Sequence, residues 1–232
     1  MVTRHAFSFG PHYDPAWTGV GPLVALNEEL LDPGSGYDEH RHATVDVVTW
    51  VAAGEVVHSD LLSGERVLRA GCLGVLRSGS GVVHAERCAP GAPGPARFLQ
   101  AWLLGSAGNE PSYDVLDVRS AAAADGLVLA AAGPGGPDAP LRLTAPAAVL
   151  RVGTLLGGAR LLLPQPAHLL ALVRGELVCS SRHAGACRLA AGDALELATA
   201  DAEVEAGPGG AEFLLWSLPE RGEAPPPGGA QH

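Results

Sequence analysis

Residues 40–86 read HRHATVDVVTWVAAGEVVHSDLLSGERVLRAGCLGVLRSGSGVVHAE, and this alternation of short apolar runs with turn residues determines the fold. Val45 to Val51 is rich in β-branched residues, which favour strands, and Glu55 begins a similar run after Gly54. Further turns are predicted at Ser63-Gly64, Gly71 and Gly79-Ser80-Gly81. The pattern predicts a meander of antiparallel strands that closes into a small jelly-roll barrel.

Two polar signatures stand at the ends of this stretch, His40-Arg41-His42 and His84-Ala85-Glu86. On an extended strand, residues two apart point to the same face and lie about 6.5–7 Å apart, so each signature would aim two metal ligands at one point. Three imidazoles and one carboxylate suit a divalent first-row metal and are close to the sets that hold non-haem iron. Such a set can leave coordination positions open, unlike a closed structural zinc site. The alternative is two unrelated surface histidines beside an ordinary His-x-Glu; the presence of both signatures favours the metal site.

The composition is that of an all-β protein. The 232 residues include 31 Gly and 19 Pro and only 17% charged residues, which indicates many short strands and turns. The net charge of -10, without any long basic run, argues against direct nucleic-acid binding. There is no secretory signal and no run long enough to span a membrane, so we expect a cytoplasmic protein without a membrane partner. In that reducing compartment we expect the cysteines, at positions 72, 88, 179 and 187, to be free.

An internal repeat predicts a second barrel. The segment around Gly54 matches that around Gly175, and the segment around Gly71 matches that around Gly192, both at an offset of 121 residues (175 − 54 and 192 − 71). Projected by this offset, the four ligand positions fall on residues that cannot bind a metal in the same way, namely Leu161, Leu163, Glu205 and Gly207.

We therefore predict a metal-binding domain over residues 1–115, a degenerate second domain over 116–219, and a disordered Pro- and Gly-rich tail over 220–232. The junction is expected between Ser106 and Pro146, where the sequence is low in complexity and rich in turn residues. The tail contains Pro225-Pro226-Pro227-Gly228-Gly229, which has little apolar surface to bury.

The chain resembles the pirins, two-barrel proteins of the cupin superfamily, and especially the bacterial quercetinase-type pirins. The match is strong over roughly residues 4–105 and extends to the second half only in layout. The resemblance implies two tandem cupin domains, with a metal site only in the N-terminal one. The stretches that carry it, in the order and spacing of the family, are His5-Ala6-Phe7-Ser8-Phe9, Tyr13-Asp14-Pro15, Gly36-Tyr37-Asp38-Glu39-His40-Arg41-His42 and Gly79-Ser80-Gly81-Val82-Val83-His84-Ala85-Glu86.

The resemblance also implies a ligand set and a reaction. His40, His42, His84 and Glu86 would hold one divalent metal ion, Fe(II) first, with Ni, Cu, Zn or Mn as other candidates. Some bacterial pirins are similar to quercetin 2,3-dioxygenases, which open the heterocycle of a flavonol with molecular oxygen. The expected partners are then a small aromatic substrate and O2, with Glu86 as both ligand and proton acceptor. A carboxylate bound to a dication is a poor base unless its coordination loosens.

Two non-enzymatic alternatives accompany this expectation. The first is a metal- or redox-dependent regulatory protein that binds a transcription factor or a metabolic enzyme, and the second is a stress-related metal-binding cupin without turnover. An open apolar pocket over the metal, large enough for a planar tricyclic ligand, would favour the enzyme. A sizeable exposed apolar or charged patch near a closed metal site would favour the regulatory protein.

The surroundings of the predicted site carry further expectations. Arg41 and Ala43 depart from the family, which has Pro and a basic residue there, so the position of a cation near the substrate is open. Asp46 shares parity with His40 and His42, and we expect it to support the ligands by hydrogen bonding, with a plain structural role or direct ligation as alternatives. His58 and Asp60 are interpreted as a solvent-facing pair. The aromatic residues Tyr37, Trp50 and Trp102 are expected in the core or along an aromatic-binding pocket.

Overall fold

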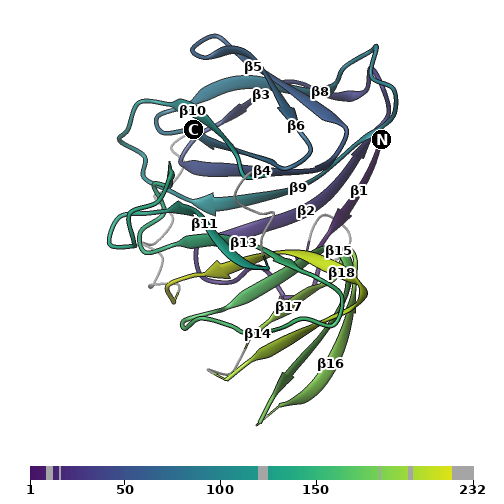
Figure 1. Cartoon of the computed structure of the whole chain (residues 1–232). Helices are drawn as coiled ribbons and strands as arrows, with labels where there is room; N and C mark the ends of the chain where they lie inside the picture. The colour runs from purple at the N-terminus through teal and green to yellow at the C-terminus, as the bar shows by residue number, and fades with distance from the viewer. Residues whose placement is uncertain (9–12, 16, 120–124, 183, 198–200, 221–232) are drawn as a thin grey trace.

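The regular elements of the described residues are all β-strands. The computed structural model describes residues 1–8, 13–15, 17–119, 125–182, 184–197 and 201–220. None of these segments forms a helix of the length and apolarity that a membrane crossing requires. The strands divide into two groups that follow one another along the chain and lie one above the other in Figure 1. The all-β prediction is confirmed.

The N-terminal half is a barrel made from two sheets. Its six-stranded sheet has the order β1 (Val2–His5), β2 (Leu23–Leu31), β9 (Ala96–Leu104), β4 (Val45–Ala53), β7 (Cys72–Arg77) and β10 (Ser112–Asp117). Its four-stranded sheet has the order β3 (Gly36–His42), β8 (Val82–Cys88), β5 (Glu55–Asp60) and β6 (Gly64–Arg69). Every pairing in both sheets is antiparallel. The predicted meander is wrong, because the chain crosses back and forth between the two sheets and, among β4 to β8, only β5 and β6 pair as consecutive strands.

The C-terminal half is a second barrel built around one eight-stranded sheet. Its main path is β12 (Leu141–Arg142), β11 (Gly126–Ala132), β13 (Val149–Leu155), β18 (Glu203–Ser217), β15 (Leu169–Ser181) and β16 (Gly185–Ala190). Two short strands complete it, β14 (Arg160–Leu162) beside β18 and β17 (Ala194–Glu196) beside β15. Residues 221–232 lie outside the described residues, so the disorder of the tail stays a prediction.

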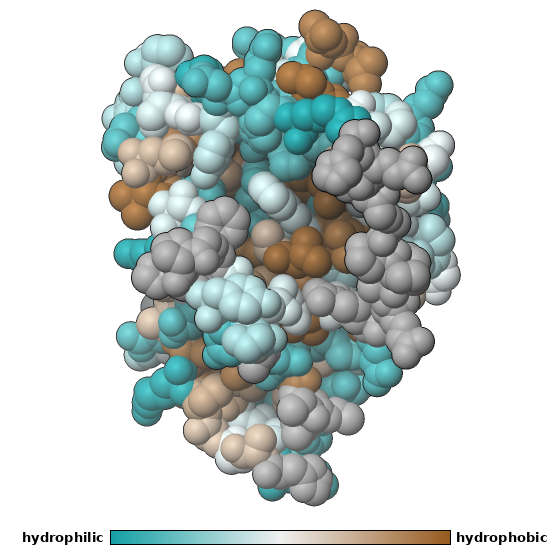
Figure 2. Space-filling view, turned by 180° about the vertical axis from the view of Figure 1, so that it is seen from behind, coloured by the Kyte–Doolittle hydropathy of each residue, from teal (hydrophilic) through white to brown (hydrophobic). Residues whose placement is uncertain are grey.

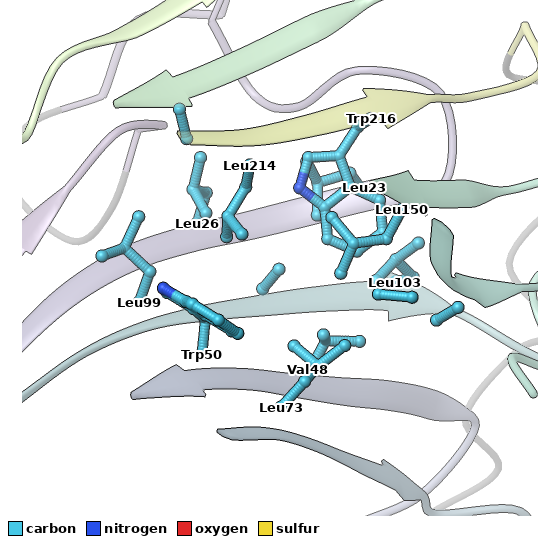
Figure 3. Close-up of a cluster of buried hydrophobic side chains, with 14 of the residues drawn as sticks. Leu23, Leu26, Val48, Trp50, Leu73, Leu99, Leu103, Leu150, Leu214 and Trp216 are labelled. Atoms are coloured by element: carbon cyan, nitrogen blue, oxygen red, sulfur yellow. The ribbon is translucent and has the colours of Figure 1, made fainter. Parts of the chain in front are cut away.

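Strand β4 is buried on both faces and joins the two halves. Val48 and Trp50 point toward the second half and pack in one cluster with Leu214 and Trp216 of β18 (Figure 3). The Trp50 indole Nε1 also donates a hydrogen bond to Glu212 Oε1 at 2.7 Å. Because residues in a strand alternate between faces, Val47, Thr49 and Val51 point the other way, into the first barrel. The six-stranded sheet is therefore a wall shared by the two halves.

The repeated glycines occupy equivalent corners of the two barrels. Gly54 has φ of 70° and Gly175 has φ of 77°, a left-handed conformation that favours glycine. A Cβ at either position would also collide with backbone, 2.5 Å from Pro95 O at Gly54 and 2.0 Å from Gly210 O at Gly175. The offset of the repeat thus has a structural basis. In the second barrel the projected ligand position Leu163 lies in an apolar core, and Glu205 pairs with Arg160 on the surface.

Asp46 takes the structural role that was given as an alternative, and not the expected role beside the metal ligands. Its buried carboxylate accepts hydrogen bonds from the Thr144 backbone N–H at 2.6 Å, the Thr144 hydroxyl at 2.7 Å and the Ala145 N–H at 3.0 Å. These partners belong to the second half. The reason lies at Thr44, whose φ of 63° breaks the strand between β3 and β4, so the parity shared with His40 and His42 does not carry across. Asp46 ties the two halves together instead.

Candidate metal centre

The two signatures meet because β3 and β8 are neighbours. In their antiparallel register His40 lies directly opposite His84, and His42 lies opposite Val82 at the next inward position. The ring centroid of His84 is 4.4 Å from that of His40 and 5.1 Å from that of His42. The Nε2 atoms of His40 and His42 are 3.1 Å apart. Each of the three histidines offers a nitrogen within 4.8 Å of those of the other two, as one metal ion would require.

The hydrogen-bond partners of these rings fit a metal. His84 Nε2 is buried and has no hydrogen-bond partner among the described residues, which is costly unless a ligand occupies it. His40 Nδ1 lies 2.8 Å from the carbonyl oxygen of Asp38, so that nitrogen carries the proton and Nε2 presents its lone pair. Ligating histidines ordinarily use their second nitrogen in this way. The residues present therefore fit a bound divalent cation.

Glu86 is buried next to the three histidines, but in a second grouping. Its carboxylate oxygen lies within 4.8 Å of nitrogens on His84 and His58, and not in the grouping with His40 and His42. Gln100 Nε2 donates to Glu86 Oε2 at 2.6 Å, and Trp102 Nε1 donates to Gln100 Oε1 at 2.9 Å. His84 belongs to both groupings and links them. The Gln100 amide holds the Glu86 carboxylate in place. Ligation of a metal by Glu86 stays a prediction.

Burial keeps the imidazoles of His42 and His84 neutral. It lowers the pKa of His42 to about 4, with help from nearby His40, and lowers the pKa of His84 to about 3, with help from His40 and His58. Burial also raises the pKa of Glu86, although the hydrogen bond from Gln100 opposes it. Metal ions bind the neutral imidazole. His42 and His84 can therefore each offer a nitrogen to a metal at neutral pH without competition from protons.

His58 and Asp60 lie inside the barrel, and their interpretation as a solvent-facing pair is wrong. The side chains are 0% and 1% exposed, and His58 Nε2 lies 2.7 Å from Asp60 Oδ2. The His58 ring stacks on Tyr113, with centroids 3.7 Å apart. Strand β5 pairs with β8 so that His58 faces Glu86 and Asp60 faces His84. The alternation with Val56, a core residue on the same strand, is the sequence signal that could have placed them inside.

A cavity of about 320 Å3 opens beside this cluster. His40 and Glu86 form part of its wall, so the cavity reaches the candidate metal centre. Tyr37 and Trp102 contribute aromatic surface, as one of the two alternatives for them anticipated, whereas Trp50 lies in the core. The opposite wall comes from β1 and β2 and includes Thr3, Asn27 and Glu29.

Sequence reasoning missed Glu29. Its side chain is buried, and it lies opposite Thr3 on β1 and Phe98 on β9. The adjacent Glu28 points to the other face of β2, where it bonds to Arg4 and Arg97. Two successive glutamates give no signal as to which one faces inward, because the strand pattern alone fits either choice.

The turn after β5 is the most exposed apolar feature among the large apolar side chains of the first barrel that the structure describes. The turn after β5 carries Leu61 and Leu62, which are 98% and 65% exposed. Figure 2 shows apolar side chains at the upper end of the molecule, the end at which the first barrel lies. Two leucines on a turn present much less surface than the roughly 800 Å2 per partner of a typical stable interface.

Comparisons with known proteins identify relatives of the chain. A family model described as Pirin matches residues 1–103. A protein of Mycobacterium tuberculosis named "Putative quercetin 2,3-dioxygenase" is 34% identical over 220 residues, which make up 94% of this chain and 88% of that protein. A protein of Escherichia coli K12 named quercetin 2,3-dioxygenase is 29% identical over 100 residues, 43% of each chain.

Solved structures show the same fold. The bacterial pirin YhhW from Escherichia coli, in complex with nickel(II), superposes with a TM-score of 0.78 and 24% identity over 94% of this chain and 91% of that chain. A quercetin 2,3-dioxygenase from Acinetobacter baumannii superposes with a TM-score of 0.70 and 19% identity over 92% of this chain and 79% of that chain. At these identities the likeness concerns the fold.

Proposed function

Because the chain belongs to the pirin family, with two cupin barrels, we propose that it is a mononuclear metal-dependent dioxygenase of the quercetin 2,3-dioxygenase type that acts on flavonols or related enolic aromatics. The observation that carries this proposal is the contact between the cavity and the candidate metal centre. A volume of about 320 Å3 lies within the range of small-molecule sites, and His40 and Glu86 are part of its wall. A planar aromatic ligand would lie between Tyr37 and Trp102 with its oxygens toward the histidines.

Different residues of the chain would bind the metal and orient the ligand. A divalent metal held by His40, His42, His84 and Glu86 would act as a Lewis acid toward an acidic hydroxyl of the ligand. Trp102 packs edge-on against His42, with centroids 4.8 Å apart, and its indole N–H holds Gln100 in the orientation that bonds Glu86. The aromatic wall and the metal ligands are thus parts of one rigid network. Such preorganisation fixes the ligand's orientation relative to the reacting centre.

Fe(II) is the metal we propose first, because a set of imidazoles and a carboxylate with open positions is typical of non-haem iron oxygenases. The Escherichia coli pirin of the same fold forms a complex with nickel(II), which supports a divalent first-row ion as the metal of this chain. Affinity alone favours nickel and copper over iron. The experiment must therefore compare metals.

The test is reconstitution of the purified protein with Fe(II) under anaerobic conditions, and with Ni, Cu, Zn and Mn in parallel, followed by quercetin in air. Flavonol absorbance and oxygen consumption are recorded together. Metal-dependent loss of both, absent in His84→Ala, supports the proposal. Stoichiometric metal binding without turnover of any flavonol overturns it and favours the regulatory alternative, for which the exposed Leu61 and Leu62 would be the first surface to test by partner capture.

A further inference from the structure

Glu29 is a second carboxyl group on the wall of the cavity, outside both groupings of candidate metal ligands. It is 1% exposed. The Thr3 hydroxyl donates to Glu29 Oε2 at 2.6 Å, and the Tyr37 hydroxyl lies 3.3 Å from the Thr3 hydroxyl. Thr3 and Tyr37 therefore fix the position of the Glu29 carboxyl at the surface of the cavity.

The carboxyl groups of Glu86 and Glu29 have different surroundings on the cavity wall. Glu86 is engaged by Gln100 at 2.6 Å and lies among the candidate ligands, where a bound dication would lower its basicity. Glu29 is not one of the candidate ligands, so a bound dication would not lower its basicity in this way. Burial raises the pKa of Glu29, although hydrogen bonds from Thr3 and Tyr37 oppose this, and a carboxyl with a raised pKa is a better proton acceptor near neutral pH. The other titratable side chains on the wall are His5, Tyr37 and His40, and Met1, which carries the N-terminal amine paired with Asp32, also lines it.

We propose that Glu29 is the proton acceptor for the acidic hydroxyl of the ligand in this cavity, an inference that rests on the proposed function. In the step, the O–H bond of the ligand breaks, its electron pair stays on the ligand oxygen, and the proton moves to the Glu29 carboxylate. The Thr3 hydroxyl donates to the carboxylate before the transfer and can rotate to accept from the carboxylic acid afterwards. Glu86 is then free to serve as a ligand without also serving as a base.

The experiment compares Glu29→Gln with Glu28→Gln, the same substitution one residue earlier on the opposite face of β2. Glutamine keeps an acceptor for Thr3 but cannot take a proton. In metal-loaded protein we expect Glu29→Gln to lower kcat roughly 10²- to 10⁴-fold with little change in KM or metal content. Glu28→Gln is expected to retain wild-type turnover. In metal-free protein, wild type and Glu86→Gln should bind quercetin as its anion, seen as a shift of the flavonol band to longer wavelength, whereas Glu29→Gln should bind the neutral form.

The outcomes separate this proposal from the proposed function. Turnover in wild type with equal kcat and an equal pH profile in Glu29→Gln would sink the role of Glu29 and leave the dioxygenase assignment standing. If wild type turns over no flavonol but its metal-free form still binds the anion through Glu29, the dioxygenase assignment fails and the proton-accepting role survives. Neutral quercetin in metal-free wild type would also overturn the role.

A different feature, in the second barrel, carries an independent inference. Cys179 on β15 lies directly opposite Cys187 on β16 in the antiparallel register. Both line one cavity of about 210 Å3, together with Leu195 and Leu197. Cys179 is buried and Cys187 is exposed. The sequence, which places the two eight positions apart, gave no indication that these thiols face each other.

Directly opposed residues in an antiparallel pair have Cβ atoms about 4.5–5.5 Å apart, and a disulfide needs about 3.5–4.5 Å. A small closure of the strand pair is therefore enough. We infer that Cys179 and Cys187 form a reversible disulfide when the protein meets a small-molecule disulfide oxidant of the glutathione type.

The reaction has an order. The Cys187 thiolate attacks the oxidant, forms a mixed disulfide and releases one small thiol; Cys179 then attacks the Cys187 sulfur and releases the second. Two protein thiols are oxidised and the oxidant is reduced to two thiols. Burial, with Cys187 nearby, raises the pKa of Cys179 to about 11, so the exposed Cys187 reacts first.

The test is incubation of the full chain with oxidised glutathione, followed by alkylation and mass mapping. We expect loss of two hydrogen masses, protection of Cys179 and Cys187 together, and reversal by a reducing dithiol. Cys179→Ser should stop at the mixed disulfide on Cys187, whereas Cys72→Ser, in the first barrel, should oxidise as wild type does. Alkylation of both thiols after oxidation, or a stable mixed disulfide in wild type, would overturn the inference.

Discussion

The Nδ1 atom of His58 lies 3.3 Å from the Nδ1 atom of His84, inside the first barrel. Since His58 Nε2 is 2.7 Å from the Asp60 carboxylate, that nitrogen carries a proton and Nδ1 is the acceptor for the proton on His84 Nδ1. The chain Asp60, His58, His84 thus leaves the His84 Nε2 lone pair facing the other two histidines. A carboxylate orients a metal ligand here through an intermediate imidazole.

Loss of His58 from this hydrogen-bonded chain is predicted to weaken metal binding. His58→Ala is expected to lower metal affinity about 10- to 100-fold, the usual effect of losing a partner of a ligating histidine. Titration with a coloured chelator measures it. Glu65→Gln, exposed on β6, is the control and should bind as wild type does. Equal affinities in His58→Ala and wild type would show that His84 needs no orientation.

Removal of a ligand itself has a larger effect. His42→Ala or His84→Ala should abolish stoichiometric metal binding while leaving the strand content unchanged, because these rings are not part of the apolar clusters. Elemental analysis and circular dichroism measure the two quantities. Retained stoichiometry in either variant would contradict the site.

Asp46→Asn is expected to act on stability instead. The change removes a charged acceptor from three hydrogen bonds to Thr144 and Ala145, and we expect the free energy of unfolding to fall by about 1–3 kcal/mol. Metal affinity should stay within a factor of two of wild type. Denaturant unfolding and chelator titration distinguish these effects, and a large loss of affinity would return Asp46 to the metal site.

The metal-free protein should lose stability in mild acid. His42 and His84 have folded-state pKa values of about 4 and about 3, below the ordinary value of 6.5. The unfolded chain therefore binds protons first, so their contribution to stability is complete above pH 6.5 and is lost as pH falls toward 3. Thermal melts between pH 7 and 4 should show this loss, and the double variant His42→Gln, His84→Gln should show a flatter profile.

Within one strand, the sequence predicted how the histidines are placed. The spacing of His40 and His42 needs only the two-residue period, and the structure does bring both rings to His84. Relations between strands were harder, because register is decided by pairings that a single segment does not contain. Asp46 was misplaced by the left-handed Thr44, and His58 by an unknown pairing with β8. Glu29 and the opposed cysteines depend on register in the same way.

The position of strand β4 between the two barrels limits which parts of the chain can be lost in evolution. The inward residues of β4 pack inside the first barrel and its outward residues pack against the second barrel, so one nine-residue strand must fit two sets of neighbours. The C-terminal barrel contributes none of the candidate metal ligands among the described residues, yet it covers the apolar face of the six-stranded sheet. Shortening the gene to the metal-binding half would expose Val48, Trp50 and their neighbours to water, and the product would aggregate before it could bind a metal.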